Sequence, residues 1–233
     1  MFKQFFNLIK KQDLLTQALN DSYEMSSIAM EMFNLVTEML FADLNAKVSD
    51  GEVEEVKKKD YLLNHFDRSI RKKVFEHVIV NEKPDQELYT SLTLITIVQN
   101  LERLGDYSKN LNEIAEIKHV MKSHAYNKLV EDYSKVLKKM YLDTFKSFKK
   151  ADVELATGVI DEHFRFKNEI DDKLTELATK EPDTNVNYVT YALILRYFKR
   201  ISAHLMNIAT SITNPIDKIG YYVGDENVIK DDE

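Results

Sequence analysis

The chain has 233 residues, of which 30% are charged and 44% are hydrophobic, a balance typical of a globular protein with a buried core. It has no cysteine, which excludes disulfide bonds, thiolate metal sites and cysteine nucleophiles. Its formal net charge of −7 argues against a protein that binds nucleic acid through phosphate contacts. No stretch approaches the roughly 18 apolar residues that span a bilayer. We therefore expect a soluble, cytoplasmic protein with no nucleic-acid partner and no direct membrane insertion.

Turn-forming residues are scarce, since only five glycines and three prolines occur. That is too few for the many turns of a strand-rich fold. No glycine-rich phosphate loop and no Gly-x-Ser-x-Gly nucleophile elbow are present. One Glu-x-x-His motif occurs, from Glu116 to His119, whereas a di-iron type carboxylate enzyme needs two. The sequence thus predicts an all-α protein that is not an enzyme, and a carboxylate-bridged metal enzyme is the weaker alternative.

The first half of the chain predicts three helices. The first runs from about Gln12 to Lys47, where small and apolar residues recur at alternating spacings of four and three. A turn and cap at Ser49–Gly51 precede the second helix, which ends near Val80 because Pro84 cannot continue a helix interior. The third helix runs from about Gln86 to beyond Glu116. The stripe expected to be buried on the first helix is Leu15, Leu19, Ser22, Ser26, Ala29, Phe33, Val36 and Leu40.

The second half repeats this order of elements. Its helices are predicted from about Asn127 to Lys150, from about Asp152 to Thr179, and from beyond Pro182 to about Thr213. Repeated segments of this kind indicate a duplicated supersecondary unit. We predict two tandem antiparallel three-helix bundles related by pseudo-symmetry, residues 1–120 and 121–233. The matching segments are Lys83–Asp85 with Glu181–Asp183, Asn64–Asp67 with Asn168–Asp171, Leu101–Asp106 with Phe198–Ala203, and Asn110 with Asn207.

Acidic residues extend the buried stripe of the third helix. At about 100° per residue, the line through Leu88, Ser91, Ile95 and Val98 continues through Glu102, Asp106 and Glu113, with Asn110 at its margin. Buried carboxylates need cations, hydrogen bonds or water, because an unpaired buried charge is costly. One interpretation is that the helix end simply emerges into solvent. The other is a binding site.

The second helix favours the binding site. Asp60 and Asp67 occupy stripe positions one heptad apart, and Asn64 lies between them on the same side. Converging carboxylate and amide oxygens without cysteine suit hard or borderline cations. We expect a divalent or trivalent metal ion with oxygen ligands (Fe, Zn, Mg, Mn or Ca) at Glu102, Asp106, Asp60, Asp67, Asn64, Asn110 and Glu113. The alternative is a polar network closed by Arg68, Arg71 or Arg103 in a helical adaptor protein that binds no metal.

The string Glu102–Asn110 resembles the repeated motif of the PhoU family, in which a glutamate and an aspartate four residues apart flank Arg-(Ile/Leu)-Gly and an asparagine follows. The aspartate-bearing helix before it, the Pro-Asp entry to the third helix and the tail Asn214–Lys218 are similar too. The resemblance covers nearly the whole chain as two repeats. It implies two three-helix bundles that hold metal ions through their acidic motifs.

The resemblance also implies a function. PhoU-like proteins are negative regulators of phosphate uptake and of the phosphate-starvation response. The implied partners are the cytoplasmic component of a phosphate transporter and a sensor histidine kinase, and a homodimer fits the same pattern. No catalytic residues are implied.

The second repeat departs from the family pattern. Lys199 stands at the position of the motif glutamate and Ala203 at that of the aspartate. A protonated lysine has no lone pair for a metal. We expect the second repeat to be metal-free, although His163 and His204 are candidates for a remodelled site. The more common role of such histidines is that of hydrogen-bonded core residues.

Overall fold

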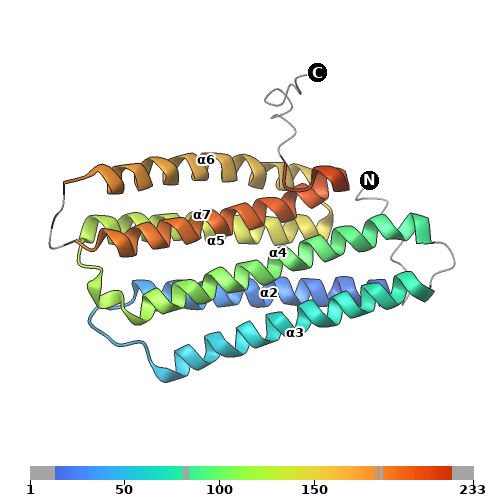
Figure 1. Ribbon diagram of the computed structural model, residues 1–233, viewed down its shortest axis with the longest axis horizontal. Coiled ribbons are helices and arrows are strands. Elements are labelled where there is room, and N and C mark those ends of the chain that lie inside the picture. The colour runs from blue at the N-terminus through green and yellow to red at the C-terminus, as the bar shows by residue number, and fades with distance from the viewer. Residues whose placement is uncertain (1–13, 81–83, 182, 184–185, 222–233) are drawn as a thin grey trace, which may run out of the picture.

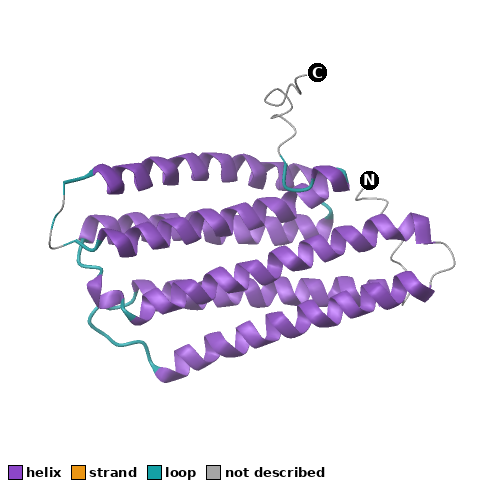
Figure 2. Cartoon of the chain, viewed as in Figure 1, coloured by secondary structure: helices purple, strands orange, loops and turns teal. Residues whose placement is uncertain are grey.

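The computed structural model describes residues 14–80, 84–181, 183 and 186–221. Across these residues every regular element is a helix and no strand occurs (Figure 2). The predicted all-α class is confirmed. None of the described helices is long and apolar enough to cross a membrane. The elements are α2 (Leu14–Phe41), α3 (Asp50–Val80), α4 (Pro84–Glu116), η1 (Lys118–Val120), α5 (His124–Lys150), α6 (Val153–Thr179), α7 (Tyr188–Thr213) and η2 (Ile216–Lys218), where η marks a short 3₁₀ helix.

The first helix ends at Phe41, earlier than the predicted end at Lys47. The Asp43 side chain accepts a hydrogen bond from the backbone N–H of Asn45 at 3.0 Å. Aspartate offers the backbone this alternative to a helix, and so favours a turn. The buried Lys118 ammonium then donates to the carbonyl of Met39 at 2.9 Å, which satisfies the last turn of α2. Gln12, where the helix was expected to begin, lies outside the described residues.

Side-chain caps fix where the other helices begin. Ser49 and Glu52 form a capping box: the Glu52 carboxylate accepts from the Ser49 N–H at 2.8 Å, and the Ser49 hydroxyl accepts from the Glu52 N–H at 3.3 Å. This confirms the predicted cap. The caps of α5, α6 and α7 are Ser123, Asp152 and Asn187, each of which accepts a hydrogen bond from a backbone N–H of the first turn.

The six long helices run roughly along one axis (Figure 1). α2, α4, α5 and α7 pack together at the centre, because α2 contacts α4 and α5 while α7 contacts α4 and α5. α3 packs against α2 and α4, and α6 packs against α7 and α5. α3 and α6 therefore flank the central four helices on opposite sides, as Figure 1 shows.

The predicted buried stripe of the first helix is confirmed, whereas that of the third helix is confirmed only in part, because Ser91 and Val98 are buried but Leu88 is 40% exposed. All eight stripe residues of α2, from Leu15 to Leu40, are buried. α2 also buries residues outside that stripe, such as Ala18, Met25 and Met32, because it contacts three other helices. On α6 the buried residues include Ala156, Val159, His163, Phe166, Ile170 and Leu177, which lie on one face of the helix.

Both halves contribute to one continuous hydrophobic core. Phe33 on α2 stacks on Tyr141 of α5 with ring centroids 4.9 Å apart. It also contacts the edge of Phe198 on α7 at 6.2 Å. All three side chains are fully buried. The halves thus share their centre, and the division into folding units 1–120 and 121–233 stays a prediction.

Candidate metal centre

A close approach of α3 and α4 sets the geometry of the acidic residues. A Cβ atom added to Gly105 would lie 2.4 Å from Cδ1 of Leu63, which is buried. Only glycine permits this spacing without a shift of Leu63. Gly105 lies within one turn of Glu102 and of Asp106, so the close approach of α3 and α4 occurs beside both acids.

Three carboxylates then form an acidic face, which we define as Asp67 on α3 with Glu102 and Asp106 on α4. Burial raises the pKa of the Glu102 carboxyl above its ordinary value, and repulsion by Asp106 raises it further. Asp67 acts in the same direction across the helix boundary. The Glu102 side chain is only 21% exposed, so its charge is poorly solvated. The charges of Asp67 and Glu102 therefore repel each other between α3 and α4.

The basic partners of these acids come from the acids' own helices. Nε of Arg71 lies 2.8 and 2.9 Å from the two carboxylate oxygens of Asp67, one turn away on α3. Arg103 lies 2.9 Å from Asp106 and 3.5 Å from Glu102, all on α4. Neither pair joins one helix to the other. The side chains of this face therefore adopt the arrangement predicted as the alternative, in which Arg71 and Arg103 pair with the acids.

The remaining predicted ligands lie farther along the helices. Asp60 accepts from Lys109 Nζ of α4 at 3.3 Å, an ion pair that does join α3 to α4. The Asn64 amide donates to the backbone carbonyl of Asp60 at 2.9 Å. Asn110 is half-buried and Glu113 is exposed. Glu113 stands about 16 Å along α4 from Glu102 at 1.5 Å per residue. One ion in contact with Glu102 cannot also contact Glu113.

The acidic face has the type of ligand that a metal ion needs, but its side chains do not converge on a common point. Two helices supply three carboxylates, the donor type that hard cations prefer. Within the described part of the chain, however, no three Asp, Glu or His side chains converge closely enough to hold one ion. The carboxylates turn instead toward Arg71 and Arg103. A metal ion would have to displace these exposed guanidinium groups.

Comparison with known proteins decides the family. The PhoU domain model matches residues 23–115 and 130–212, one match in each half. The chain belongs to the PhoU family. The resemblance first noted at Glu102–Asn110 is thereby confirmed for most of the chain.

Related proteins agree with this assignment. The chain is 22% identical over 200 residues to a "Phosphate-specific transport system accessory protein PhoU homolog" from Clostridium acetobutylicum, covering 82% of this chain and 90% of the relative. It is 26% identical over 188 residues to the protein of the same description from Caulobacter vibrioides, covering 76% and 80%. The crystal structure of PhoU from Pseudomonas aeruginosa has the same fold, with a TM-score of 0.77 at 20% identity over 88% of this chain and 97% of that one.

The two PhoU repeats can be placed in register from their contacts. Gly105 lies against Leu63 in the first repeat, and Ser202, at the matching motif position, hydrogen-bonds His163 in the second. His163 therefore takes the place of Leu63 rather than that of Asp60. Two heptad series agree with this register, since both are buried: Val56, Leu63, Ile70 and His77 in α3, and Ala156, His163, Ile170 and Leu177 in α6.

This register corrects the predicted match between Asn64–Asp67 and Asn168–Asp171 by one helical turn. The similarity of the two strings misled because neighbouring turns of an amphipathic helix carry similar residues. In the structure Asp67 corresponds to Lys167, and Arg71 corresponds to Asp171.

Both candidate histidines of the second repeat are core residues with hydrogen-bond partners. Nδ1 of His163 lies 3.0 Å from the Ser202 hydroxyl, and Nδ1 of His204 lies 2.9 Å from Oδ1 of Asn100. Burial lowers the pKa of each imidazole to about 4. His204 also stacks on Tyr107 with ring centres 5.5 Å apart. They bind different partners, so they form no shared site with each other.

The contacts between the halves could not be predicted from the sequence. Tyr107 and His204 occupy corresponding positions of α4 and α7 and stack on each other, and Arg200 Nε donates to the Tyr107 hydroxyl at 3.1 Å. A repeat predicts that the two positions correspond but not that they meet. The Lys109–Asp60 ion pair could not be predicted either, because the sequence does not show how far α3 is shifted along α4.

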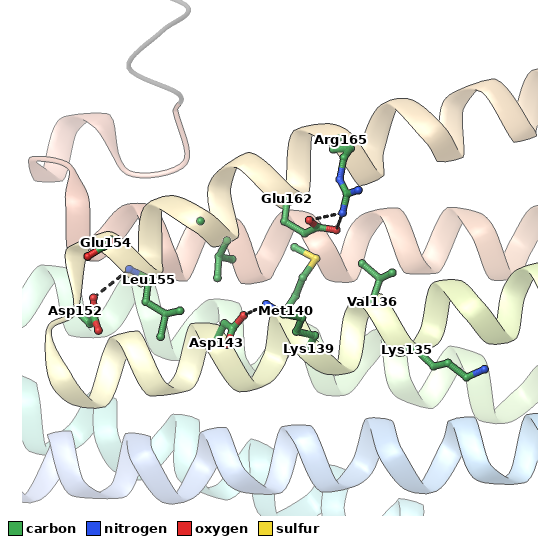
Figure 3. Close-up of a pocket in the computed structure, with 12 residues that line it drawn as sticks. Lys135, Val136, Lys139, Met140, Asp143, Asp152, Glu154, Leu155, Glu162 and Arg165 are labelled. Atoms are coloured by element: carbon green, nitrogen blue, oxygen red, sulfur yellow. Dashed lines mark hydrogen bonds and ion pairs between the residues drawn. The ribbon is translucent and has the colours of Figure 1, made fainter.

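A cavity of about 720 Å³ lies away from the acidic face, between α5 and α6 (Figure 3). Val136, Met140, Leu155 and Val159 supply its apolar part. Among its charged groups, Lys139 pairs with Asp143, Arg165 pairs with Glu162, and Asp152 caps α6.

Proposed function

We propose that this chain is an accessory regulator of phosphate transport. It acts by contact with the cytoplasmic component of a phosphate transporter or with a sensor histidine kinase, and it catalyses no reaction. The observation that carries the proposal is the match of the PhoU domain model to both halves. The relatives described as phosphate-specific transport accessory proteins, which align with most of this chain, support it.

The regulatory role is tested in cells of the source organism. Deletion of the gene should raise phosphate uptake under phosphate-replete growth, and expression of the intact chain should restore the original rate. Uptake is measured with radiolabelled phosphate in the deletion strain, in the complemented strain and in the parent. Unchanged uptake in the deletion strain at both high and low phosphate would contradict the proposal.

We further propose that the acidic face holds a divalent or trivalent cation such as Fe, Zn, Mg, Mn or Ca. The support is the electrostatic repulsion of Glu102 by Asp67, which acts between two helices at largely buried carboxylates. A cation bound there would neutralise that repulsion and join α3 to α4. The intrahelical pairs of Arg71 and Arg103 are half-exposed, and such pairs contribute little to stability, so a multivalent ion can compete with them.

Metal content is measured on protein purified without added metal, followed by titration with Mn²⁺ after chelation. The unmodified chain should bind at least one ion. Glu102→Gln with Asp106→Asn should abolish that binding, because it removes two charged oxygen donors and keeps the side-chain shapes. Glu113→Gln is the matched control, since Glu113 lies on the same helix beyond reach of the ion. Equal binding in the double variant and in the control would refute the site.

The pairs formed by Arg71 and Arg103 favour a second candidate, a helical adaptor of the same family that needs no metal. In that case the arginines close the network permanently. The same titration separates the two candidates, because an adaptor of this kind would contain no ion when purified. It would also show no saturable Mn²⁺ binding in the unmodified chain, in the double variant or in the control.

A further inference from the structure

The second repeat inverts the charge pattern of the acidic face. In the first repeat, Asp67, Arg71, Glu102 and Asp106 place three acids and one base where α3 meets α4. The corresponding residues of α6 and α7 carry two bases and one acid. In the register set by the Gly105–Leu63 and Ser202–His163 contacts, they are Lys167, Asp171, Lys199 and Ala203.

The inverted charges form a contact between helices. Nζ of Lys199 on α7 pairs with the carboxylate of Asp171 on α6. The Lys199 side chain is only 19% exposed, whereas that of Asp171 is 44% exposed, so the ion pair is buried on the lysine side alone. In the first repeat Glu102 occupies the corresponding position, and its charge interacts with those of Asp67 and Arg71 on α3. The charges of Lys199 and Lys167 both disfavour the protonated form of His163, so both ammonium groups contribute positive potential at the same side chain.

Other oxygen donors of the second repeat are committed elsewhere. Asn207, which corresponds to the motif residue Asn110, donates its amide to Oδ1 of Asn100 at 3.1 Å. Its own Oδ1 faces Gly220, where an added Cβ would come within 3.2 Å of it. The side chain is therefore enclosed between α4 and the segment after η2. Ala203 contributes no donor at all.

We infer that the ammonium group of Lys199 does in the second repeat what the proposed metal ion does in the first: it joins α7 to α6 through Asp171, and with Lys167 it keeps any metal cation out. The comparison rests on the proposed function of the acidic face. A regulator built this way responds to metal through one half only, while the other half is closed by its own lysine. Two matched PhoU repeats would be expected to hold one metal site each, but only the first repeat keeps its site.

The test rebuilds an acidic face in the second repeat of the full-length chain. Lys167→Asp, Lys199→Glu and Ala203→Asp together supply acids around Asp171. The matched control is Lys167→Asn, Lys199→Gln and Ala203→Asn, which has the same shapes without the charges. Bound Mn²⁺ is counted by titration followed by electron paramagnetic resonance. The melting temperature of each variant is recorded in EDTA and in Mn²⁺.

We expect the acidic variant to bind one more Mn²⁺ than the unmodified chain, and the amide variant to bind none more. In EDTA the acidic variant should melt at a lower temperature than the amide variant, because its carboxylates repel, and Mn²⁺ should reverse the difference. Adding Asp171→Asn to the acidic variant should weaken the new site by at least about tenfold, as loss of a ligand group does.

The outcomes separate this inference from the proposed metal site. One extra ion in the acidic variant, with none in the unmodified chain, would refute the first-repeat site and leave the role of Lys199 standing. No extra ion in a folded acidic variant, with one in the unmodified chain, would refute the inference alone. If the acidic variant fails to fold, Lys199→Gln decides: it should lower the melting temperature equally in EDTA and in Mn²⁺, and a loss that Mn²⁺ restores would overturn the inference.

Discussion

At the scale of single residues, Glu102 combines burial with repulsion from two acids. Its pKa in the folded chain lies above the ordinary value of 4.5, so the folded state binds a proton that the unfolded chain has already released. The free energy of unfolding therefore decreases as the pH rises from the unfolded-state pKa of Glu102 through its folded-state pKa. At neutral pH the ionised Glu102 remains destabilising. In metal-free protein, we expect Glu102→Gln to raise the urea midpoint at pH 7, an advantage that disappears below about pH 4.

The measurement is urea unfolding followed by circular dichroism, in EDTA, at several pH values. Glu113→Gln serves as the control because Glu113 is exposed. With saturating Mn²⁺ the order should reverse, since the variant has lost a ligand. A Glu102→Gln chain that is less stable than the unmodified chain in EDTA would show that Arg103 and Arg71 outweigh the burial of Glu102.

His204 has the opposite dependence on pH. Burial and the nearby Arg200 and Arg103 lower its pKa to about 4, below the ordinary 6.5. Between these two values His204 is protonated in the unfolded chain and neutral in the folded chain. Stability is thus lost as the pH falls from about 6.5 toward 4. His204→Gln should reduce the loss of stability between pH 7 and pH 5 by about 1–2 kcal/mol. His65→Gln, at an exposed position, should leave that loss unchanged.

At the scale of helices, two glycines have opposite surroundings. A Cβ on Gly105 would clash with Leu63 at 2.4 Å, whereas a Cβ on Gly158 meets nothing within 4 Å. Alanine is favoured over glycine in a helix by about 1 kcal/mol, and overpacking a core costs about 1–3 kcal/mol. Gly158→Ala should therefore stabilise the chain by up to about 1 kcal/mol, while Gly105→Ala should destabilise it by about 1 kcal/mol.

Urea unfolding measures both changes, and Mn²⁺ titration of Gly105→Ala adds a functional readout. Because Gly105 sets the separation of α3 and α4, its alanine variant should also bind Mn²⁺ more weakly. If both variants gained stability, Leu63 would have moved aside without cost, and the close approach would not determine the acidic face.

Helix positions and the buried stripe of α2 could be predicted from the sequence because each depends on local periodicity. Leu15 to Leu40 recur on one face whatever the rest of the chain does, and Ser49 with Glu52 caps a helix without distant partners. The register of α6 against α7 could not be predicted in this way. Asp171 looked like the counterpart of Asp67, since a slip of one turn preserves an amphipathic pattern. Only the contact between His163 and Ser202 fixes the register.

At the scale of the whole molecule, the core formed by Phe33, Tyr141 and Phe198 couples the halves. Phe33→Ala should cost about 3–5 kcal/mol, the usual range for a buried phenylalanine. Because the ring touches α5 and α7 as well as its own half, we expect α3 and α6 to lose protection from hydrogen exchange together. Loss confined to α2–α4 would contradict the coupling. Leu142→Ala, at an exposed position of α5, is the control.

The shared core also bears on ancestry. A chain with only one repeat would leave the Phe33 face of α2 and the Tyr107 face of α4 uncovered, and such faces need an apolar partner. The stacked pair Tyr107 and His204 stands at matching places in the two repeats, as it would across a twofold axis. A single-repeat ancestor would thus have been a homodimer with two identical acidic faces. When the two copies are joined in one chain, each can change alone, which a symmetric dimer cannot do, and Lys199 at the position of Glu102 is a difference of that kind.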